Sequence, residues 1–244
     1  MRLLLRVLLM IAVTGLAVLH GADTPPHVVV FLADDLGWED CKTPNMTRLG
    51  REGMTLTHAF VASPSCAPSR AALLTGLSCA HNGAMFNHSR PGAIIKKWPK
   101  FFSEIGYETA AIGKTAHYGQ VKEYGFDHAS HFTYHDDTCI DAACTWLEAR
   151  KSERPLCLIV GTNWPHVPWP KATRVEKAPP ANLIDTAETR AAYAQYLTAV
   201  EKADADLGKV YDTARRTLGS NVLFLFTSDH GAQLPFGKWN CYDQ

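Results

Sequence analysis

Four short apolar runs, each followed at once by polar residues, constrain the fold of this chain more than any other feature. Each run has the length and composition of a buried strand, and together they cover residues 27–33, 107–113, 155–164 and 221–228. Helical patterns lie between them, over residues 44–53, 68–75, 98–106, 137–153 and 186–217. Strands that alternate with helices predict an α/β domain with a mostly parallel sheet covered on both faces.

The residues that follow these strands can all take part in chemistry: they are Asp34, Asp35, Lys114, His166, Asp229 and His230. In an open α/β sheet, ligands bind outside the carboxyl ends of the strands. Four separate segments therefore direct reactive groups to one edge of the sheet, which indicates an active site.

Two of these strand ends form a candidate site for a divalent cation, Asp34-Asp35 and Asp229-His230. Carboxylate oxygens suit a hard cation such as calcium or magnesium, and His230 is the least usual ligand of the four. The alternative is that Asp34 and Asp35 only cap the next segment or form an Asx turn. The second pair at another strand end favours the metal site.

The segment SPSCAPSRAALLTG, residues 63–76, places Cys66 just ahead of a short helix predicted for Pro68–Thr75. Arg70 in its first turn opposes the helix dipole, and a cation kept there suggests an anionic ligand. Cys66 could be a structural cysteine, a thiolate nucleophile or a residue converted into another group. A phosphatase-type thiolate loop has the spacing Cys-x5-Arg, whereas this chain has Cys-x3-Arg, which argues against the second alternative.

Composition and the amino-terminal residues indicate an exported protein. The 244 residues carry a formal net charge of zero, so no basic excess points to nucleic acid. Arg2 and Arg6 lie in an apolar run without acidic residues, which predicts a signal peptide at residues 1–22, with an uncleaved membrane anchor as the alternative. We expect a secreted, periplasmic or lysosomal protein with no membrane segment in its mature form. The odd number of cysteines, seven, leaves at least one unpaired within the chain.

The motif Cys66-Ala67-Pro68-Ser69-Arg70, followed by AALLTG, resembles the signature of the sulfatases. In that family Cys-x-Pro-Ser-Arg directs oxidation of the cysteine to formylglycine. Other segments agree with it, in order along residues 26–243. They are HVVVFLADDLGW, Gly113-Lys114-Thr115-Ala116-His117, Asn163-Trp164-Pro165-His166, Thr227-Ser228-Asp229-His230-Gly231 and Gly237-Lys238-Trp239-Asn240-Cys241-Tyr242-Asp243.

The resemblance implies a metal site and a modified nucleophile. Calcium, or magnesium in its place, would be bound by Asp34, Asp35, Asp229, His230 and the modified Cys66, although many members have asparagine where His230 stands. One hydroxyl of the hydrated formylglycine would attack sulfur and form a covalent sulfate ester. The second hydroxyl would then eject sulfate, a step that an unmodified thiol cannot undergo.

The remaining matching residues would handle charge and protons. The resemblance implies that Arg70 and Lys114 hold the formylglycine. Lys238 and His166 would hold sulfate oxygens or assist the leaving group. His117 would orient or deprotonate the hydrated aldehyde.

The resemblance also implies the alkaline-phosphatase-like fold, a three-layer α/β/α arrangement. Sulfatases usually continue into a smaller C-terminal subdomain, so we expect residues 23–244 to be a catalytic domain without that subdomain. The implied activity is sulfuric ester hydrolysis on sulfated glycans or aryl sulfates, sulfamidases included, and the implied partner is a formylglycine-generating enzyme. Two alternatives stay open: a phosphonate or phosphate monoester hydrolase of the same superfamily, and a catalytically inactive sulfatase-like binding protein.

Overall fold

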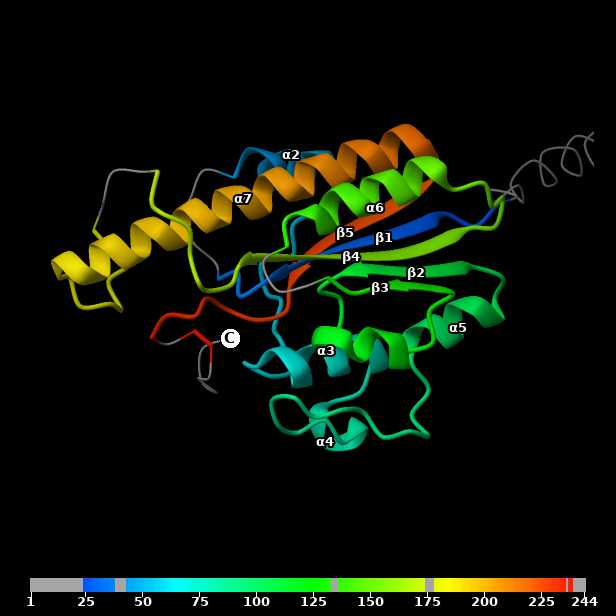
Figure 1. The fold of residues 1–244 in the computed structure, drawn as a ribbon, viewed down its shortest axis with the longest axis horizontal. Helices are drawn as coiled ribbons and strands as arrows, with labels where there is room; N and C mark the ends of the chain where they lie inside the picture. The colour runs from blue at the N-terminus through cyan, green and yellow to red at the C-terminus, as the bar shows by residue number, and fades with distance from the viewer. Residues whose placement is uncertain (1–23, 38–42, 133–135, 174–177, 236, 239–244) are drawn as a thin grey trace, which may run out of the picture.

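Five parallel strands form the central sheet, in the order β3-β2-β4-β1-β5 (Figure 1). The strands are β1 (His27–Asp34), β2 (Glu108–Gly113), β3 (His128–Ser130), β4 (Leu156–Pro165) and β5 (Val222–Ser228). The computed structural model describes residues 24–37, 43–132, 136–173, 178–235 and 237–238. The expected signal peptide at residues 1–22 lies outside these ranges, as do Cys41 and Cys241.

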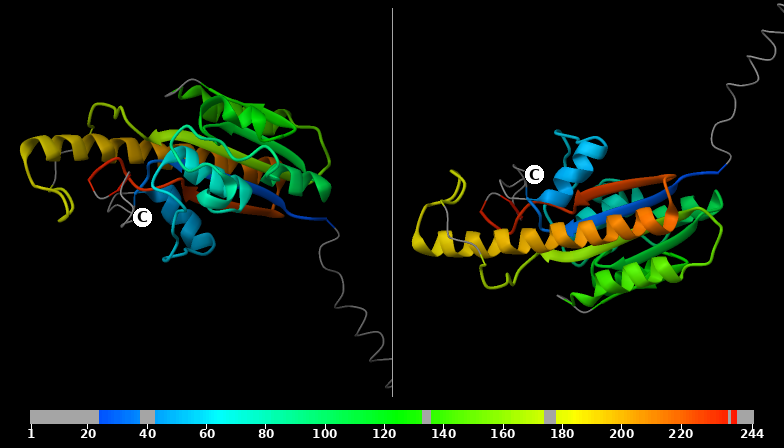
Figure 2. Two further views of the ribbon diagram at one scale, coloured as in Figure 1. Left: turned by 90° about the horizontal axis from the view of Figure 1, so that it is seen from below. Right: turned by 90° about the horizontal axis from the view of Figure 1, so that it is seen from above.

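Helices cover both faces of the sheet, which confirms the predicted three-layer α/β/α architecture (Figures 1 and 2). On one face lie α2 (Pro44–Glu52), α6 (Thr138–Ala149) and α7 (Ala187–Leu218). On the other lie α3 (Cys66–Thr75), α4 (Cys79–Asn82) and α5 (Trp98–Glu104), while Tyr118–Glu123 forms a short 3-10 helix, η1. The two central strands, β1 and β4, are therefore buried on both sides, as their continuous apolar sequences predict.

The two layers of core meet on opposite faces of β1. Val29 and Phe31 pack with the residues of α6 and α7, whereas Val28 and Val30 pack with Leu74 of α3 on the other face. This alternation follows from the period of two along a strand. The apolar residues of the strands are thus used in the two core layers, and the polar residues lie at the carboxyl ends of the strands, at the edge of the sheet.

A buried carboxylate joins α2 to α7. Asp204 of α7 accepts hydrogen bonds from the backbone N–H groups of Asn45 and Met46 at 3.1 and 2.8 Å, and from the Asn45 amide at 2.9 Å. These N–H groups open α2, which has no side-chain cap of its own. A negative charge at this end also complements the helix dipole. The contact holds the segment that follows the Asp34-Asp35 pair against the long helix.

Two glycines let the ends of β2 and β4 approach closely. A Cβ atom on Gly161 would lie 2.1 Å from the carbonyl oxygen of Lys114, and one on Gly113 would lie 2.1 Å from the carbonyl oxygen of Gly161. The backbone N–H of Lys114 donates to that same Gly161 oxygen at 2.9 Å. Only glycine fits at these two positions, and the approach sets where Lys114 leaves the sheet.

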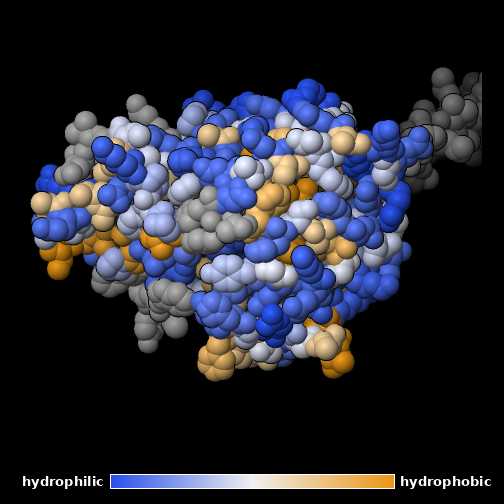
Figure 3. Space-filling model, in the orientation of Figure 1, coloured by the Kyte–Doolittle hydropathy of each residue, from blue (hydrophilic) through white to orange (hydrophobic). Residues whose placement is uncertain are grey.

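The view in Figure 3 shows a mostly hydrophilic surface, with apolar side chains gathered at its lower edge, where α4 lies. The residues that follow α4 in the chain include three exposed apolar side chains, Met85, Phe86 and Ile94. Across the described part of the chain, no helix is both long and apolar enough to cross a bilayer.

Candidate active site

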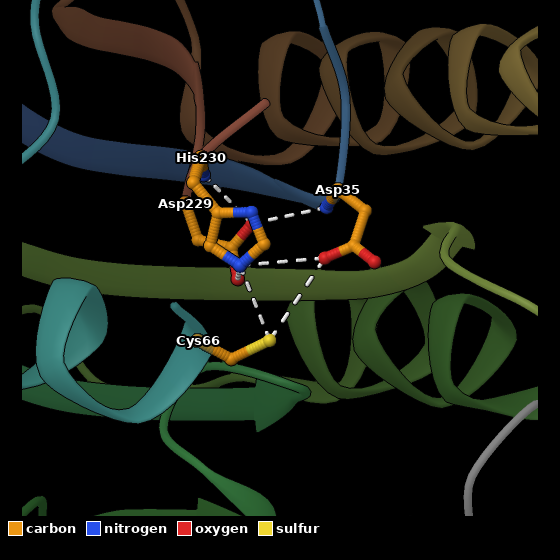
Figure 4. Close-up of side chains that lie close together, drawn as sticks. All are labelled: Asp35, Cys66, Asp229 and His230. Carbon is orange, nitrogen blue, oxygen red and sulfur yellow. Dashed lines mark hydrogen bonds and ion pairs between the residues drawn. The ribbon is translucent and has the colours of Figure 1, made fainter. Parts of the chain in front are cut away.

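The carboxyl ends of β1 and β5 and the start of α3 bring together four side chains that could hold a metal ion (Figure 4). One ligand atom from each of Asp35, Cys66, Asp229 and His230 lies within 4.8 Å of the others, and all four residues are buried. Cys66 Sγ is 3.2 Å from His230 Nε2 and 3.8 Å from Asp35 Oδ1. Residues far apart in the sequence thus meet at the edge of the sheet that their strand-end positions predict.

The turn after β1 aims Asp34 and Asp35 in different directions. Asp35 has a φ of 65°, a left-handed conformation that aspartate tolerates better than most residues. Its backbone N–H donates to Asp229 Oδ1 at 3.0 Å, and the N–H of Asp229 donates to the Ala33 carbonyl at 3.2 Å. These cross-bonds fix the two acidic strand ends relative to each other.

Helix α3 begins two residues earlier than the sequence predicts. Cys66 is its first residue, after Ser65, and Gly76 ends it with a φ of 68°. Arg70 is therefore in the second turn, not the first, so its conflict with the helix dipole is weaker than expected. The helix is held to the end of β5 because the Ser69 hydroxyl donates to the Asp229 carbonyl and Arg70 Nε donates to Asp229 Oδ2 at 2.9 Å.

Asp34 is not among the four closely grouped ligand atoms, because two cations bind its carboxylate. Arg70 donates to its Oδ1 at 3.0 Å and Lys114 donates to its Oδ2. Arg70 also donates to the carbonyl of Lys114. Asp34 Oδ1 nevertheless lies only 3.9 Å from Cys66 Sγ, so Asp34 also borders the thiol.

Lys238 and His166 form the opposite side of the site. Lys238 Nζ donates to both carboxylate oxygens of Asp35, at 2.8 and 3.1 Å, and lies 3.0 Å from His166 Nε2. His166 Nδ1 lies 2.7 Å from the carbonyl oxygen of Val167, which requires a proton on Nδ1 and leaves Nε2 as the acceptor for Lys238. Burial, then Lys114 and Lys238, lowers the pKa of His166 to about 2, so its imidazole is neutral.

Carboxylates crowd the site enough to perturb one another. Burial and the charges of Asp34 and Asp229 raise the pKa of Asp35 to about 8, and burial raises that of Asp34. Burial would raise the pKa of Asp229 too, but Arg70, His230 and Lys114 hold it well below its usual range. The surroundings therefore disfavour the charged form of Asp35, and a bound cation would stabilise its carboxylate.

His230 is oriented as a ligand. Its Nδ1 lies 3.0 Å from the carbonyl oxygen of Gly231, which places a proton on Nδ1, and its Nε2 faces Cys66 and lies 3.4 Å from Asp35 Oδ1, where the neutral ring carries a lone pair. A hydrogen bond from the other ring nitrogen to a carbonyl is the usual support of a metal-bound histidine. With two carboxylates beside this lone pair, the residues present fit a divalent cation.

Burial, followed by the charges of Asp229 and Asp34, raises the pKa of the Cys66 thiol above its ordinary value. A reactive thiolate needs positive surroundings, whereas three carboxylates lie around this sulfur. The unmodified side chain is therefore a neutral thiol, consistent with the spacing argument against a phosphatase-type nucleophile. Cys79, Cys139, Cys144 and Cys157 are also free, so the five cysteines that the structure describes form no disulfide.

His117 lies beside this cluster without a described contact to Cys66. Its Nε2 is 2.7 Å from Nδ1 of His88, a residue that the sequence did not single out. The signal that could have found His88 is weak, because it lies in a loop and outside the motifs that resemble the sulfatases. Burial, then Lys114, His88 and Arg70, lowers the pKa of His117 to about 3.

The family model named Sulfatase matches residues 26–244. The chain belongs to the sulfatase family. Its curated relatives include the ulvan-active sulfatase of Formosa agariphila, which is 28% identical over 86% of this chain and 46% of its own length. Human N-sulphoglucosamine sulphohydrolase is 27% identical over 89% of this chain and 53% of its own length. This sulfatase chain thus spans about half the length of these two relatives.

Solved structures confirm the fold of this sulfatase domain. One that holds its substrate D-glucosamine-2-N,6-O-disulfate superimposes with a TM-score of 0.74 at 20% identity, over 85% of this chain and 66% of the other. The phosphonate monoester hydrolase of Agrobacterium radiobacter gives a TM-score of 0.66 at 16% identity, over 84% of this chain and 62% of the other. The shared fold therefore includes a protein with a sulfated sugar as its substrate and an enzyme named for phosphonate monoesters.

Proposed function

We propose that this protein hydrolyses sulfate esters of glycans, with Cys66 converted to formylglycine. The observation that carries the proposal is the position of Cys66 at the centre of the site, with carboxylates on one side and three cations, Arg70, Lys114 and Lys238, within the same cluster. Fixed cations in a buried site stabilise the oxyanions of a transferring group far better than water does.

The modified residue supplies a hydrated aldehyde, in which one hydroxyl attacks sulfur and the other allows sulfate to leave. Around it, Arg70 and Lys114 neutralise Asp34 and hold the modified side chain. Lys238, which donates to His166 Nε2, is placed to bind a sulfate oxygen, and its proton can be shared with the leaving oxygen. Burial opposes the charged form of Lys238, but Asp35 keeps its pKa raised, so it stays a cation.

The proposed metal is calcium, or magnesium in its place. Asp34, Asp35, Asp229 and His230 would hold it, together with the modified Cys66. A bound cation there would act as a Lewis acid on an ester oxygen and as a template for the sulfate group. The oriented lone pair of His230 and the crowded Asp35 support this assignment.

Glycan substrates are proposed because the relatives are named for them. They include the ulvan-active enzyme, N-acetylglucosamine-6-O-sulfatase of Bacteroides thetaiotaomicron and N-sulphoglucosamine sulphohydrolase, so both sulfate esters and sulfamates belong in the test panel. We further propose that residues 1–22 direct export of a catalytic domain over residues 23–244 to a secreted, periplasmic or lysosomal location. A formylglycine-generating enzyme is the proposed partner.

Mass spectrometry of the peptide that contains Cys66 tests the mechanism in full-length protein from its native host. We expect a mass about 18 Da below that of the thiol peptide, together with sulfate release from sulfated sugars or aryl sulfates. An unmodified thiol would contradict the mechanism and favour an inactive binding protein. Phosphate or phosphonate ester cleavage without sulfate release would favour the phosphonate hydrolase alternative.

A further inference from the structure

His88 and His117 form a pair outside the sulfatase motif residues. Their hydrogen bond, Nδ1 of His88 to Nε2 of His117, is 2.7 Å long, and the rings meet edge to face with centroids 4.6 Å apart. His117 is 4% exposed, whereas His88 belongs to an exposed loop after α4. A buried site residue is therefore bonded to a side chain that reaches the surface.

The backbone of His88 has an uncommon conformation that neighbouring residues stabilise. Its φ is 67°, a left-handed value that is uncommon for a side-chain-bearing residue. Gln120 Nε2 donates to its carbonyl at 3.2 Å, and its ring stacks on Tyr118 with an interplanar angle of 7°. Several contacts thus point the His88 ring at one atom, His117 Nε2.

The second nitrogen of His117 lacks a partner. Nδ1 is buried and accepts or donates no hydrogen bond among the described residues. Burial, then Lys114, His88, Arg70 and Lys238, lowers the pKa of His117, so the ring is neutral and one nitrogen carries the proton and the other a lone pair. A buried N–H without a partner costs the full desolvation of a donor, and the surrounding cations favour a lone pair over an N–H dipole.

We propose that His88 is a positioning residue, which accepts the N–H of His117 Nε2 and so keeps His117 Nδ1 as an unprotonated acceptor for the reaction. The inference rests on the proposed function and on the role that the motif resemblance implies for His117, deprotonation of the hydrated aldehyde at position 66. The proton moves from the free hydroxyl of the sulfated hydrate to Nδ1, while the aldehyde C=O bond forms, the C–O bond to the sulfate group breaks and sulfate leaves. The resulting imidazolium is stabilised because its Nε2–H stays bonded to His88. The ring then gives its proton to water, and addition of a second water molecule to the aldehyde restores the hydrate.

Two variants separate this role from general loss of the loop. His88→Asn places an amide oxygen where Nδ1 stands and tolerates the left-handed φ, whereas the amide of His88→Gln lies beyond that position. In full-length protein converted at position 66, we expect His88→Asn to keep kcat within about threefold. We expect His88→Gln to lose about 10- to 100-fold in kcat with little change in KM, as for impaired general base catalysis.

His81→Gln is the matched control, because His81 is another exposed histidine of this segment and its ring contacts Ser78 instead. It should leave kcat and KM at wild-type values. Wild-type kinetics in His88→Gln would overturn the proposal, as would equal losses in His88→Gln and His88→Asn with unchanged melting temperatures.

The protonation of the His117 ring can also be measured directly, without an activity assay. Nitrogen NMR of ¹⁵N-histidine-labelled protein, assigned with His117→Gln, reports which ring nitrogen carries the proton. We expect Nδ1 of His117 to be unprotonated in the wild type and in His88→Asn, and a mixture of tautomers in His88→Gln. A protonated Nδ1 in the wild type would overturn the role of His88. Absence of sulfate release from a converted wild-type protein would instead overturn the proposed function, and the NMR result would stand apart from it.

Discussion

The surroundings of Cys66 disfavour a reactive thiolate, which supports the proposed conversion of this residue. Its sulfur lies beside His230 and two aspartates, which disfavour a thiolate, and Arg70 is paired with Asp34 and Asp229 instead of with the sulfur. A structural cysteine would need none of these charged neighbours. Both the spacing between Cys66 and Arg70 in the sequence and the charged neighbours of Cys66 in the structure thus argue against a phosphatase-type thiolate.

Replacing Cys66 by serine tests the nucleophile directly. In a host that modifies cysteine, we expect Cys66→Ser to lose sulfate release by roughly 10³-fold or more, because a serine hydroxyl cannot eject sulfate as the hydrated aldehyde can. The melting temperature should change little, since the substitution replaces one small buried group by another. Steady-state assay and thermal denaturation check the two parts. Retained turnover would show that Cys66 is not the source of the nucleophile.

Among the secondary-structure elements, those with a strong local pattern were predictable and the weakly patterned ones were not. The continuous apolar runs of β1 and β4 and the long periodic pattern of α7 appear in the structure near their predicted bounds. β3 was missed because His128–Ser130 is a three-residue edge strand with no apolar run. The site edge followed from strand ends, but the pairing of Asp34 with Lys114 depends on how β2 and β4 approach, which no local pattern encodes.

The contact between α2 and α7 leaves no room for a larger residue at Gly208. A Cβ there would lie 2.5 Å from the side-chain amide of Asn45, which Asp204 holds in place. We expect Gly208→Ala to lower the free energy of unfolding by about 1–3 kcal/mol, as for an overpacked core, despite the better helix propensity of alanine. Urea denaturation measures this. Ala205→Gly, at an exposed position of the same helix, is the control for the effect of helix propensity alone. A Gly208→Ala variant more stable than the wild type would show that the Asn45 side chain moves aside at little cost.

Asp206 of α7 makes the packing of this helix on β4 depend on pH. Burial raises its pKa from 3.8 to about 6, although Thr162 donates to it at 2.7 Å. The folded state therefore binds the proton more tightly than the unfolded state, so the contribution of Asp206 to stability is greatest below pH 4. This contribution is lost as the pH rises through about 6.

Asp206→Asn removes this dependence while keeping an acceptor for Thr162. Relative to the wild type, we expect the variant to gain stability as the pH rises from 4 to 7, by at most about 3 kcal/mol. Denaturation at several pH values measures the difference. Asp212→Asn, an exposed residue of the same helix paired with Arg48, should show no comparable trend. A constant difference between wild type and Asp206→Asn would contradict the raised pKa.

For the whole molecule, three carboxylates and three cations held in one buried cluster make the site a determinant of stability as well as of chemistry. The exposed side of β5 is a second global feature. Leu223 and Leu225 are 49% and 43% exposed on this strand, whose outer edge pairs with no other strand among the described residues. Both features act on the domain as a unit and not on one element.

Metal binding should therefore raise the melting temperature of the whole domain. With Ca²⁺ at 100 times its dissociation constant, mass action adds about 2.7 kcal/mol to the stability of the folded state. That corresponds to roughly 5 °C or more for a domain of this size. Chelator-treated protein with and without added Ca²⁺ or Mg²⁺ measures the shift. Asp35→Asn should abolish the shift in melting temperature, and Asp212→Asn should retain it. A chelator-treated protein whose melting temperature is the same with and without each added ion would refute the metal site.

Cys66 is 2% exposed, and eight of the other nine residues of α3 are buried as well. Under the proposed conversion, a modifying enzyme could not reach this residue in the folded domain, so we expect the oxidation to precede the docking of α3. Folding and oxidation would then compete for the same newly made chain, and the fraction of active protein would depend on the ratio of their two rates. Conditions that delay folding would raise specific activity without altering a single contact in the finished structure.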